Sequence, residues 1–440
     1  MEPRRLLIAA LLLAGLSGLL WWSNKEEGNK DKTASPDDAP KIVEIPQDQI
    51  QKVELRRMGA EPVVLEKGAA WMLQSPKALP ADPDAVNALV STLAVLPSDR
   101  LVDDKTTDLK PYGLTEPLIT VVVRRKDGKT HTLQIGDNAP SGSAAYARMD
   151  GETKLYTISS STKATFEKTW RDLRDRRLLP FDAEKLTRVE LTAKGSSVEL
   201  GKNNGNTWAI LKPRPLRADN FAAEELVRKL KDARLEVVND TEEEAAIPGQ
   251  FAAAAPVGIA KVTDAKGTMQ LEVRKGKDNA YFAKSSAVEG VFKTSAELGD
   301  GLGKGLDDLR NKKLFEFGFN QPDRVEVKQD GTAYTFTKAG AEWKKDGKSI
   351  DPGSVQQIVD RLRELSAIKF AETAAGAVTA EYSVGKETVT VTKQGETYFA
   401  RRANEPDVYV LDGKTLADIR ELAAGAKELP PASADKDKKK

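Results

Sequence analysis

A set of landmarks recurs along this chain with a spacing near 136 residues. The triplet Val-Glu-Leu at 53–55 returns at 189–191, and Val-Glu-Val stands at 325–327. A tryptophan and then an aspartate follow each triplet: Trp71 and Asp82, Trp208 and Asp219, Trp343 and Asp351. Solenoid repeats have periods of roughly 20–50 residues. A period this long therefore predicts domains, each with its own core, arranged in series.

The segment after each aspartate has the pattern of an amphipathic helix. Positions +4, +7, +8 and +11 from the aspartate are apolar, which places them on one helix face. The aspartate is a natural N-cap, because its carboxylate accepts the free amide hydrogens of the first turn. The predicted core positions are Val86, Leu89, Val90 and Leu93; Ala223, Leu226, Val227 and Leu230; and Val355, Ile358, Val359 and Leu362.

Segments of alternating polarity surround each predicted helix and indicate antiparallel hairpins. A further strand follows near Lys154, Gly290 and Asp407, and a second helix should close each unit. The predicted fold class is α+β, with three tandem repeats of an antiparallel-sheet-plus-helix module after an N-terminal transmembrane helix. The third module is expected to be shortened between its tryptophan and its last strand. The predicted modules are residues 45–181, 182–318 and 319–425.

One basic-then-apolar phrase occurs twice, as DLRDRRLLPF at 172–181 and DLRNKKLFEF at 308–317. We interpret it as the end of the closing helix followed by an apolar step into the next module. A last module has nothing to join, and the third lacks the phrase. A basic patch for phosphate or lipid headgroups is the alternative, but acidic residues are interleaved. On a helix, these charges would form pairs four residues apart: Arg171 with Asp175, Asp172 with Arg176, and Asp308 with Lys312.

The N-terminal sequence predicts where the protein is located in the cell. Arg4 and Arg5 precede 17 uncharged residues, Leu6 to Trp22, which end in two tryptophans. This order predicts a membrane anchor over residues 1–22, with a cytoplasmic N-terminus and an exported body. A cleaved signal peptide is the alternative. Residues 23–44 have the composition of a flexible linker, and 426–440 that of a disordered basic tail.

Composition excludes several classes of chemistry. The net charge of +1 argues against a nucleic-acid-binding protein. The absence of cysteine excludes disulfides and thiolate metal sites. His131 is the one histidine, so zinc sites and Ser-His-Asp triads lack partners. We predict no catalytic residues, no cofactor-binding residues, no metal ligands and no cofactor.

Four further patterns have a functional and a structural interpretation. The glycine-rich run from Gly299 departs from a phosphate-binding loop, because Gly305 follows Lys304 where Ser or Thr is needed. A flexible lead-in to a helix explains it better. The acidic runs 103–108 and 240–244 lack the calcium-loop spacing and are interpreted as solvated loops. The three tryptophans could stack carbohydrate or peptide, but core positions are the commoner use.

Three stretches carry a resemblance to a known family: YGLTEPLITVVV from Tyr112, IGDNAPSGSAAYARMDGETKLYTIS from Ile135, and LRDRRLLPF from Leu173. Together they resemble domain-of-unknown-function family 4340. The resemblance covers most of 45–181, the second module more loosely, and only the strand–Trp–helix core of the third. It implies a bacterial inner-membrane protein with repeated α+β modules, often encoded beside an ABC transporter of gliding-motility type. It implies no enzymatic activity and supplies no catalytic residues.

The leading hypothesis is therefore a non-catalytic, membrane-anchored envelope protein whose partners are ABC transporter subunits. A periplasmic hydrolase that uses buried carboxylates is the first alternative. A periplasmic glycan- or peptide-binding protein, released by signal cleavage, is the second.

Overall fold

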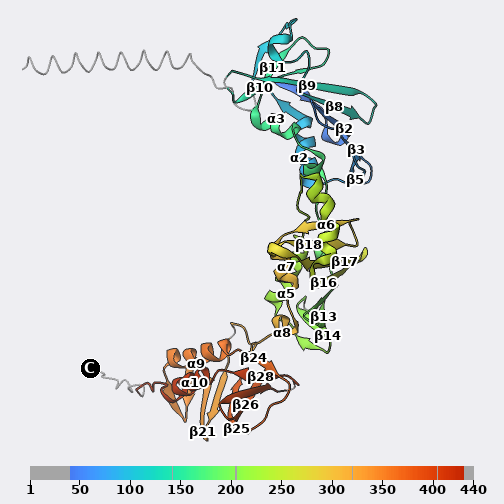
Figure 1. The fold of residues 1–440 in the computed structure, drawn as a ribbon. Coiled ribbons are helices and arrows are strands. Elements are labelled where there is room, and N and C mark those ends of the chain that lie inside the picture. The colour runs from blue at the N-terminus through green and yellow to red at the C-terminus, as the bar shows by residue number, and fades with distance from the viewer. Residues whose placement is uncertain (1–39, 141, 204–205, 320, 404, 431–440) are drawn as a thin grey trace, which may run out of the picture. The chain divides into compact units, whose positions relative to one another are not determined.

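The computed structural model describes residues 40–140, 142–203, 206–319, 321–403 and 405–430 (Figure 1). The chain forms two compact units, with the division between Arg176 and Arg177. The first unit holds one large antiparallel sheet and the second unit holds two. The fold is α+β, as predicted. Each large sheet, with its helices, is called a module below.

The predicted membrane anchor, 1–22, and most of the predicted linker lie outside the described residues. Among the residues that are described, no helix is long and apolar enough to cross a membrane.

The first module begins with a short strand and ends with a one-turn helix. Its elements are β1 (Lys41–Glu44), η1 (Gln47–Gln49), β2 (Ile50–Arg57), β3 (Val63–Lys67), β4 (Trp71–Ser75), β5 (Leu79–Pro80), α2 (Pro83–Ala94), β6 (Val95–Pro97), β7 (Arg100–Asp103), η2 (Lys110–Tyr112), β8 (Ile119–Arg125), β9 (Thr130–Asn138), β10 (Ala144–Met149), β11 (Leu155–Ser159), α3 (Ser160–Phe166) and α4 (Trp170–Leu173).

The second module keeps the main strands and helices of this order, without counterparts of β1, β6 and β7, and adds one further helix, α6, after the first. Its elements are η3 (Ala183–Lys185), β12 (Arg188–Ala193), β13 (Ser196–Lys202), β14 (Trp208–Lys212), β15 (Leu216–Arg217), α5 (Asn220–Lys231), α6 (Thr241–Ala253), β16 (Ala255–Asp264), β17 (Gly267–Lys275), η4 (Lys277–Asn279), β18 (Tyr281–Ser285), β19 (Val291–Thr294), α7 (Ala296–Leu302) and α8 (Leu306–Leu309).

The third module keeps the strands of the second and has one more at the edge of its sheet. Its elements are β20 (Arg324–Gln329), β21 (Thr332–Ala339), β22 (Glu342–Lys345), β23 (Lys348–Ile350), α9 (Pro352–Glu364), β24 (Lys369–Ala371), β25 (Ala377–Val384), β26 (Glu387–Gln394), β27 (Thr397–Arg402), β28 (Val408–Leu411) and α10 (Gly413–Ala424). We expected shortening between Trp343 and the last strand. The third module is shorter than the second in the connection from α9 to β25, residues 365–376, and in the step from Trp343 to Asp351.

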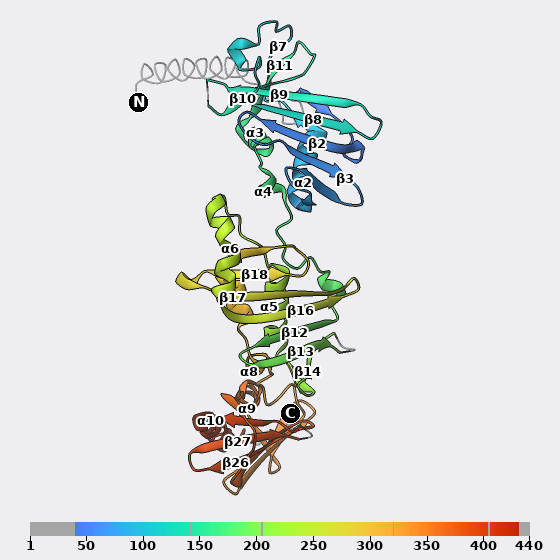
Figure 2. The ribbon, with the colours of Figure 1, turned by 45° about the vertical axis from the view of Figure 1, so that its right-hand side comes forward.

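The three large sheets share one order over eight strands, and the first and third sheets have a ninth strand at the edge. The first two sheets read β5-β4-β3-β2-β8-β9-β10-β11-β7 and β15-β14-β13-β12-β16-β17-β18-β19, and the third reads β23-β22-β21-β20-β25-β26-β27-β28-β24. In each sheet, the first four strands run from the middle to one edge as a meander. The first helix then crosses over, and a second meander begins beside the first strand and runs to the opposite edge. Strands β12, β13 and β14 can be followed side by side in Figure 2.

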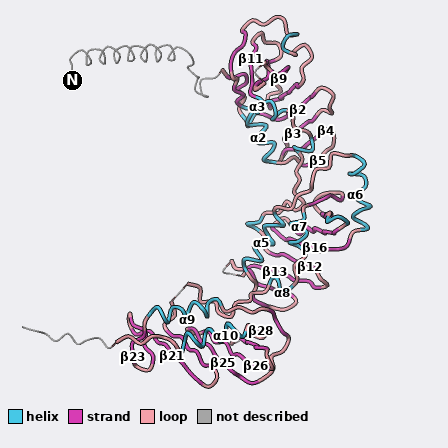
Figure 3. Tube along the Cα trace, turned by 60° about the vertical axis from the view of Figure 1, so that its left-hand side comes forward, coloured by secondary structure: helices cyan, strands magenta, loops and turns pink. Residues whose placement is uncertain are grey.

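The predicted helix register is confirmed in all three copies. Each of the twelve apolar positions is buried, and in each module the four belong to one hydrophobic core. In the third module, α9 packs beside α10 (Figure 3). The predicted N-caps are also present. Asp82, Asp219 and Asp351 each accept a backbone amide hydrogen from the first turn of their helix.

Asp219→Ala is expected to lower the free energy of unfolding of the second unit by about 1 kcal/mol, the usual effect of losing an N-cap. The substitution removes the acceptor for the Ala222 amide, 2.9 Å away. Asp232→Ala, at the other end of the same helix, is the matched control and should change stability by less than about 0.5 kcal/mol. Urea denaturation followed by circular dichroism measures both. Equal effects would mean that the cap contributes nothing.

Each module is closed by its own C-terminal segment. The backbone amides of the three capping aspartates, Asp82, Asp219 and Asp351, donate to the carbonyls of Leu173, Leu309 and Lys427, each at 2.8 Å. Isolated β-bridges lie beside these bonds: Ala81 with Arg174, Ala218 with Arg310, and Ile350 with Glu428. The residues expected to start the disordered tail therefore belong to the third module up to Leu429, and 431–440 lie outside the described residues.

The basic-then-apolar phrase divides differently from our expectation. Helices α4 and α8 end at Leu173 and Leu309, so the expected pairs that need positions 175, 176 and 312 are not helical pairs. Asp172 instead completes a capping box with Thr169. The first half of each phrase closes the module before it.

The second half of the phrase opens the next module. Leu178, Leu179 and Phe181 lie in the core of the second module, not the first. Leu314 and Phe315 likewise lie in the core of the third. The first module has the same opening in β1, where Ile42 and Val43 are buried. The sequences are KIVEI, RLLPF and KLFEF, beginning at Lys41, Arg177 and Lys313, each 136 residues apart.

This placement moves the expected boundaries by four to six residues toward the N-terminus. Residues 41–44, expected as linker, belong to the first module. The reason is physical: each opening strand pairs with the backbone that follows the first helix of its own module. Lys41 pairs with Pro97, Arg177 with Arg234, and Lys313 with Ser366.

Candidate functional site at the joint of the second and third modules

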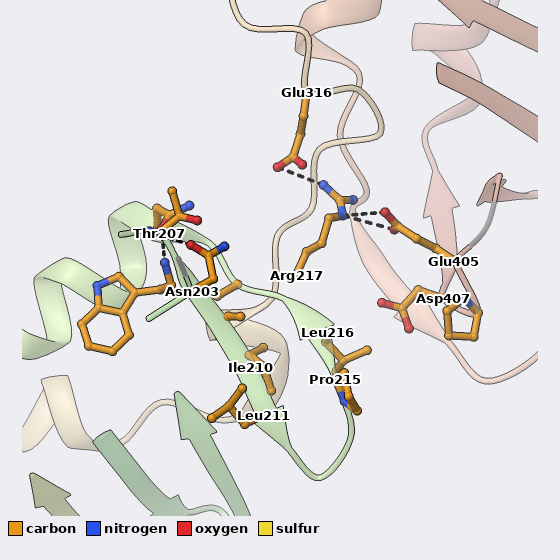
Figure 4. A pocket seen from close by; sticks show the side chains of 15 residues that line it. Asn203, Thr207, Ile210, Leu211, Pro215, Leu216, Arg217, Glu316, Glu405 and Asp407 are labelled. Carbon is orange, nitrogen blue, oxygen red and sulfur yellow. Dashed lines mark hydrogen bonds and ion pairs between the residues drawn. The ribbon is translucent and has the colours of Figure 1, made fainter. Parts of the chain in front are cut away.

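The second and third modules meet in a network of charged side chains. Arg214 lies in the turn before β15, and Arg217 ends that strand. Glu405 lies in the loop before β28, and Glu316 lies in the opening segment of the third module. Figure 4 shows Arg217 extended between Glu316 and Glu405.

Arg217 is the centre of the network. Its guanidinium lies 3.1 Å from a carboxylate oxygen of Glu316 and 3.1 Å from one of Glu405. It also donates to the Lys313 carbonyl at 2.7 Å and to the Tyr409 hydroxyl at 2.9 Å. Tyr409 in turn donates to Glu405 at 3.1 Å. The guanidinium is therefore held by a carbonyl, a hydroxyl and two carboxylates, which fixes its position.

Burial and charge shift two pKa values in this network. Burial raises the pKa of the Tyr409 phenol, although the neighbouring Arg217 opposes that rise. Burial alone would lower the pKa of Arg217. Its neighbours Tyr409, Glu316 and Glu405 together raise that pKa by more than burial lowers it, so the net shift is upward. The phenol therefore keeps its proton and Arg217 keeps its charge throughout the neutral range.

Asp407 forms the most buried ion pair of the joint. Its side chain is 7% exposed and lies 2.6 Å from Arg214 and 3.1 Å from Arg310, which is 8% exposed. The Arg310 guanidinium also lies over the ring of Phe370, in β24. A buried carboxylate requires such partners, because an unpaired charge in a low-dielectric site is costly.

Arg217 and Asp407 are not part of the shared framework, whereas Arg310 stands one period after Arg174 in the repeated phrase. Arg217 stands two residues before the capping aspartate, where the first and third modules have Pro80 and Ser349. Asp407 directly precedes the last sheet strand of the second meander, where the other modules have Lys154 and Gly290. Arg217 and Asp407 therefore serve the contact between the second and third modules rather than the repeated fold.

Two adjoining cavities open along the joint. One, of about 440 Å³, lies between β14–β15 and the loop that carries Glu405 and Asp407. The other, of about 450 Å³, lies between the start of α5 and residues 311–319. Asn220 and Glu316 line both. Cavities of this size at domain junctions are common ligand sites.

The carboxylates of the joint are engaged in ion pairs. Glu316 and Glu405 share Arg217, and Arg402 lies 3.0 Å from Glu387 and 3.3 Å from Glu405. This arrangement suits them to hold two modules together. General acid–base catalysis would instead need one carboxyl group free to accept a proton and another to donate one.

The candidate residues from the sequence lie elsewhere and are not brought together. His131 lies on β9, opposite Val123 of β8, and is partly buried. Gly299 lies inside helix α7, not in a flexible lead-in. A side chain there would collide with the ring of Tyr281, so the glycine serves close packing.

The acidic runs and the tryptophans also have structural roles. Asp103 accepts a hydrogen bond from the Lys105 amide, which lowers the pKa of that carboxyl group together with the Thr106 hydroxyl. Asp240 caps α6. Trp208 and Trp343 are core residues and Trp71 packs against the core, so the core interpretation holds. Among the described residues, no group of three or more His, Asp or Glu side chains could hold a metal ion.

Two further cavities lie outside the joint. One of about 720 Å³ is walled by the second half of α6 and by η4, and one of about 590 Å³ lies between α9 and α10. The first has small side chains along its helical wall, including Ala246, Gly249 and Ala253.

The comparisons agree with the repeated architecture. The profile of a family described as a domain of unknown function, DUF4340, matches residues 71–248 and again residues 208–386. The two matches begin at Trp71 and Trp208, which occupy equivalent positions on β4 and β14. Each runs through a linking segment into the next module. No curated protein and no solved structure matches the chain. Because the two matches together span more than half of its residues, the chain belongs to the DUF4340 family.

Proposed function

We propose that this protein is a non-catalytic, membrane-anchored component of the bacterial cell envelope that acts as an accessory or scaffold protein, with ABC transporter subunits as its partners. One observation carries the proposal: the framework is repeated, whereas the surfaces placed on it differ. The caps and closing bonds occur three times, but Arg217 and Asp407 are replaced by other residues at the equivalent positions of the other modules. This is the design of proteins that use copies of one stable unit to present different contacts.

We further propose that the three modules are copies of one unit, with the third extending past the matched region. Its strand order, capping aspartate, closing bond and opening KLFEF segment support this. In this view the protein is a series of three family modules behind an anchor. Tethering to one membrane raises the effective concentration of a partner in that membrane, so even a weak contact would suffice.

The anchor is supported by the sequence of residues 1–22. We expect full-length protein to remain in membranes after high-salt washing, and a reporter active only after export to be active when fused after Lys440. The positive charges of Arg4 and Arg5 would retain the N-terminus in the cytoplasm. Recovery of a shortened, soluble periplasmic protein would contradict the anchor and favour the released binding protein.

The hydrolase alternative has its own test. Glu316 and Glu405 line the same cavity but share one arginine, which favours a structural role for the pair. We expect purified residues 40–440 to show no turnover on a panel of ester, glycoside and peptide substrates. Turnover that disappears in Glu316→Gln or Glu405→Gln, with the melting temperature unchanged, would establish a hydrolase instead.

A further inference from the structure

Two phenylalanines are exposed beside one cavity of the joint. The side chain of Phe221, at the start of α5, is 79% exposed, and that of Phe319 is 94% exposed. Both line the cavity of about 450 Å³, together with Lys313 and Arg363. Single exposed apolar residues are ordinary, but a pair beside one cavity marks an interaction surface.

The fold does not need these aromatic side chains. Phe221 stands two residues after the capping aspartate, where the other modules have Asp84 and Gly353. The position of Phe319 is filled by Ala183 one period earlier. Their presence in one copy alone points to a contact made by that copy.

The surface is also preorganised. The Arg363 guanidinium lies 5.0 Å from the ring centre of Phe317 and 5.8 Å from that of Phe319. It donates to the Gly318 carbonyl at 2.6 Å and pairs with Asp360. Cation–π contacts and this hydrogen bond hold the exposed segment against α9, which reduces the entropy lost on binding.

The charges around the cavity select the partner. Asp219 is engaged in capping α5, Glu316 pairs with Arg217, and Arg363 pairs with Asp360. Within the described part of the chain, the exposed Lys313 ammonium has no ion-pair partner, so it is available to a carboxylate. The cavity continues through Asn220 and Glu316 into the neighbouring one. We call these two adjoining cavities the groove. Neighbouring cavities of this kind can take successive side chains of one extended segment.

We propose that this groove binds an extended segment of a partner protein that carries an aromatic or large aliphatic side chain next to an acidic residue. The apolar side chain would lie between Phe221 and Phe319, and the carboxylate would face Lys313. This inference rests on the proposed function and names the surface through which that function operates.

Photo-crosslinking of the full-length chain in intact cells tests the groove. Benzoylphenylalanine would replace Phe221, Phe319 or, as a control, Val378, which is 65% exposed on β25. We expect positions 221 and 319, but not 378, to crosslink to one partner segment, and mass spectrometry to map an acidic residue beside its apolar anchor. Equal crosslinking at 378, no crosslink at 221 or 319, or a segment without acids would overturn the proposal.

The mapped segment then serves as a labelled peptide in a binding titration with the purified full-length chain. Phe319→Ser and Phe221→Ser should each weaken binding about tenfold or more, as for an aromatic anchor. Lys313→Glu should also weaken it, whereas Val378→Ser and Lys386→Glu should leave it unchanged. If the wild-type chain captures a membrane partner that these variants retain, the groove is wrong and the proposed function stands. If no partner is captured at all, the proposed function itself fails.

Discussion

A fragment that begins at Asp182 is expected to unfold far more readily than one that begins at Arg177, when both end at Pro430. The five residues removed include Leu178, Leu179 and Phe181, which are almost fully buried in the core of the second module. Burial of each such side chain contributes roughly 1.5–3 kcal/mol. Their loss should therefore cost about 4–9 kcal/mol, which approaches the whole stability of a domain.

The backbone contributes in the same direction. The Leu178 amide donates to the Ala233 carbonyl, and the Leu178 carbonyl accepts from the Ser285 hydroxyl. Thermal and urea denaturation of the two fragments measure the difference. A third fragment, which begins at Asp172, is the control. It should have the same melting temperature as the fragment from Arg177, because the added Asp175 amide donates to the Pro80 carbonyl of the first unit, which both fragments lack. Equal midpoints for the 182 and 177 fragments would contradict the assignment of the opening strand.

Asp407→Asn should destabilise the second unit by about 3–5 kcal/mol, the usual effect of breaking a buried ion pair from one side. The substitution keeps the shape of the side chain but leaves Arg214 and Arg310 facing a neutral amide. Arg310 has little access to water to compensate for the loss. The measurement is the free energy of unfolding of residues 177–430.

Asp330→Asn provides the matched control for this substitution. Asp330 pairs with Arg420 at 3.2 Å, but both side chains are about half exposed. Asparagine also tolerates the left-handed backbone that Asp330 adopts, with φ of 51°. We expect a change of at most about 1 kcal/mol, typical of an exposed ion pair. If Asp330→Asn cost as much as Asp407→Asn, burial would not be the cause.

Local patterns in the sequence were sufficient for the helices capped by Asp82, Asp219 and Asp351 and for most strands, but they missed α6. Helix α5 illustrates why: its cap, its polar face and its four buried positions all lie within twelve residues of Asp219. Amphipathic periodicity reports burial directly, so the same reasoning succeeded in all three copies. The β8–β9 and β16–β17 hairpins were predictable for the same reason.

The linking phrase shows where local reasoning failed. Leu178 and Phe181 are apolar in either module, and nothing within the phrase says which core they join. Their partners, such as Ala233, lie more than fifty residues further on. The KIVEI segment at Lys41 is the missed signal, because a third copy one period earlier places the apolar step at the start of a module.

The joint was beyond sequence reasoning altogether. Arg217 and Glu405 are 188 residues apart, and Arg214 and Asp407 are 193 apart. Arginines and acids are frequent throughout this chain, so no spacing distinguishes these four. The one available hint was that Arg217 replaces Pro80 and Ser349 at equivalent positions. Such departures from a repeat mark residues added for a contact rather than for the fold.

The most direct test of the proposed function is crosslinking of the full-length chain in intact cells, followed by mass spectrometry of the captured proteins. The proposal predicts recovery of membrane subunits of an ABC transporter, together with no turnover by the purified body, residues 40–440. Recovery of no membrane-transport subunit, combined with measurable hydrolase activity of that body, would contradict it and establish the enzyme instead.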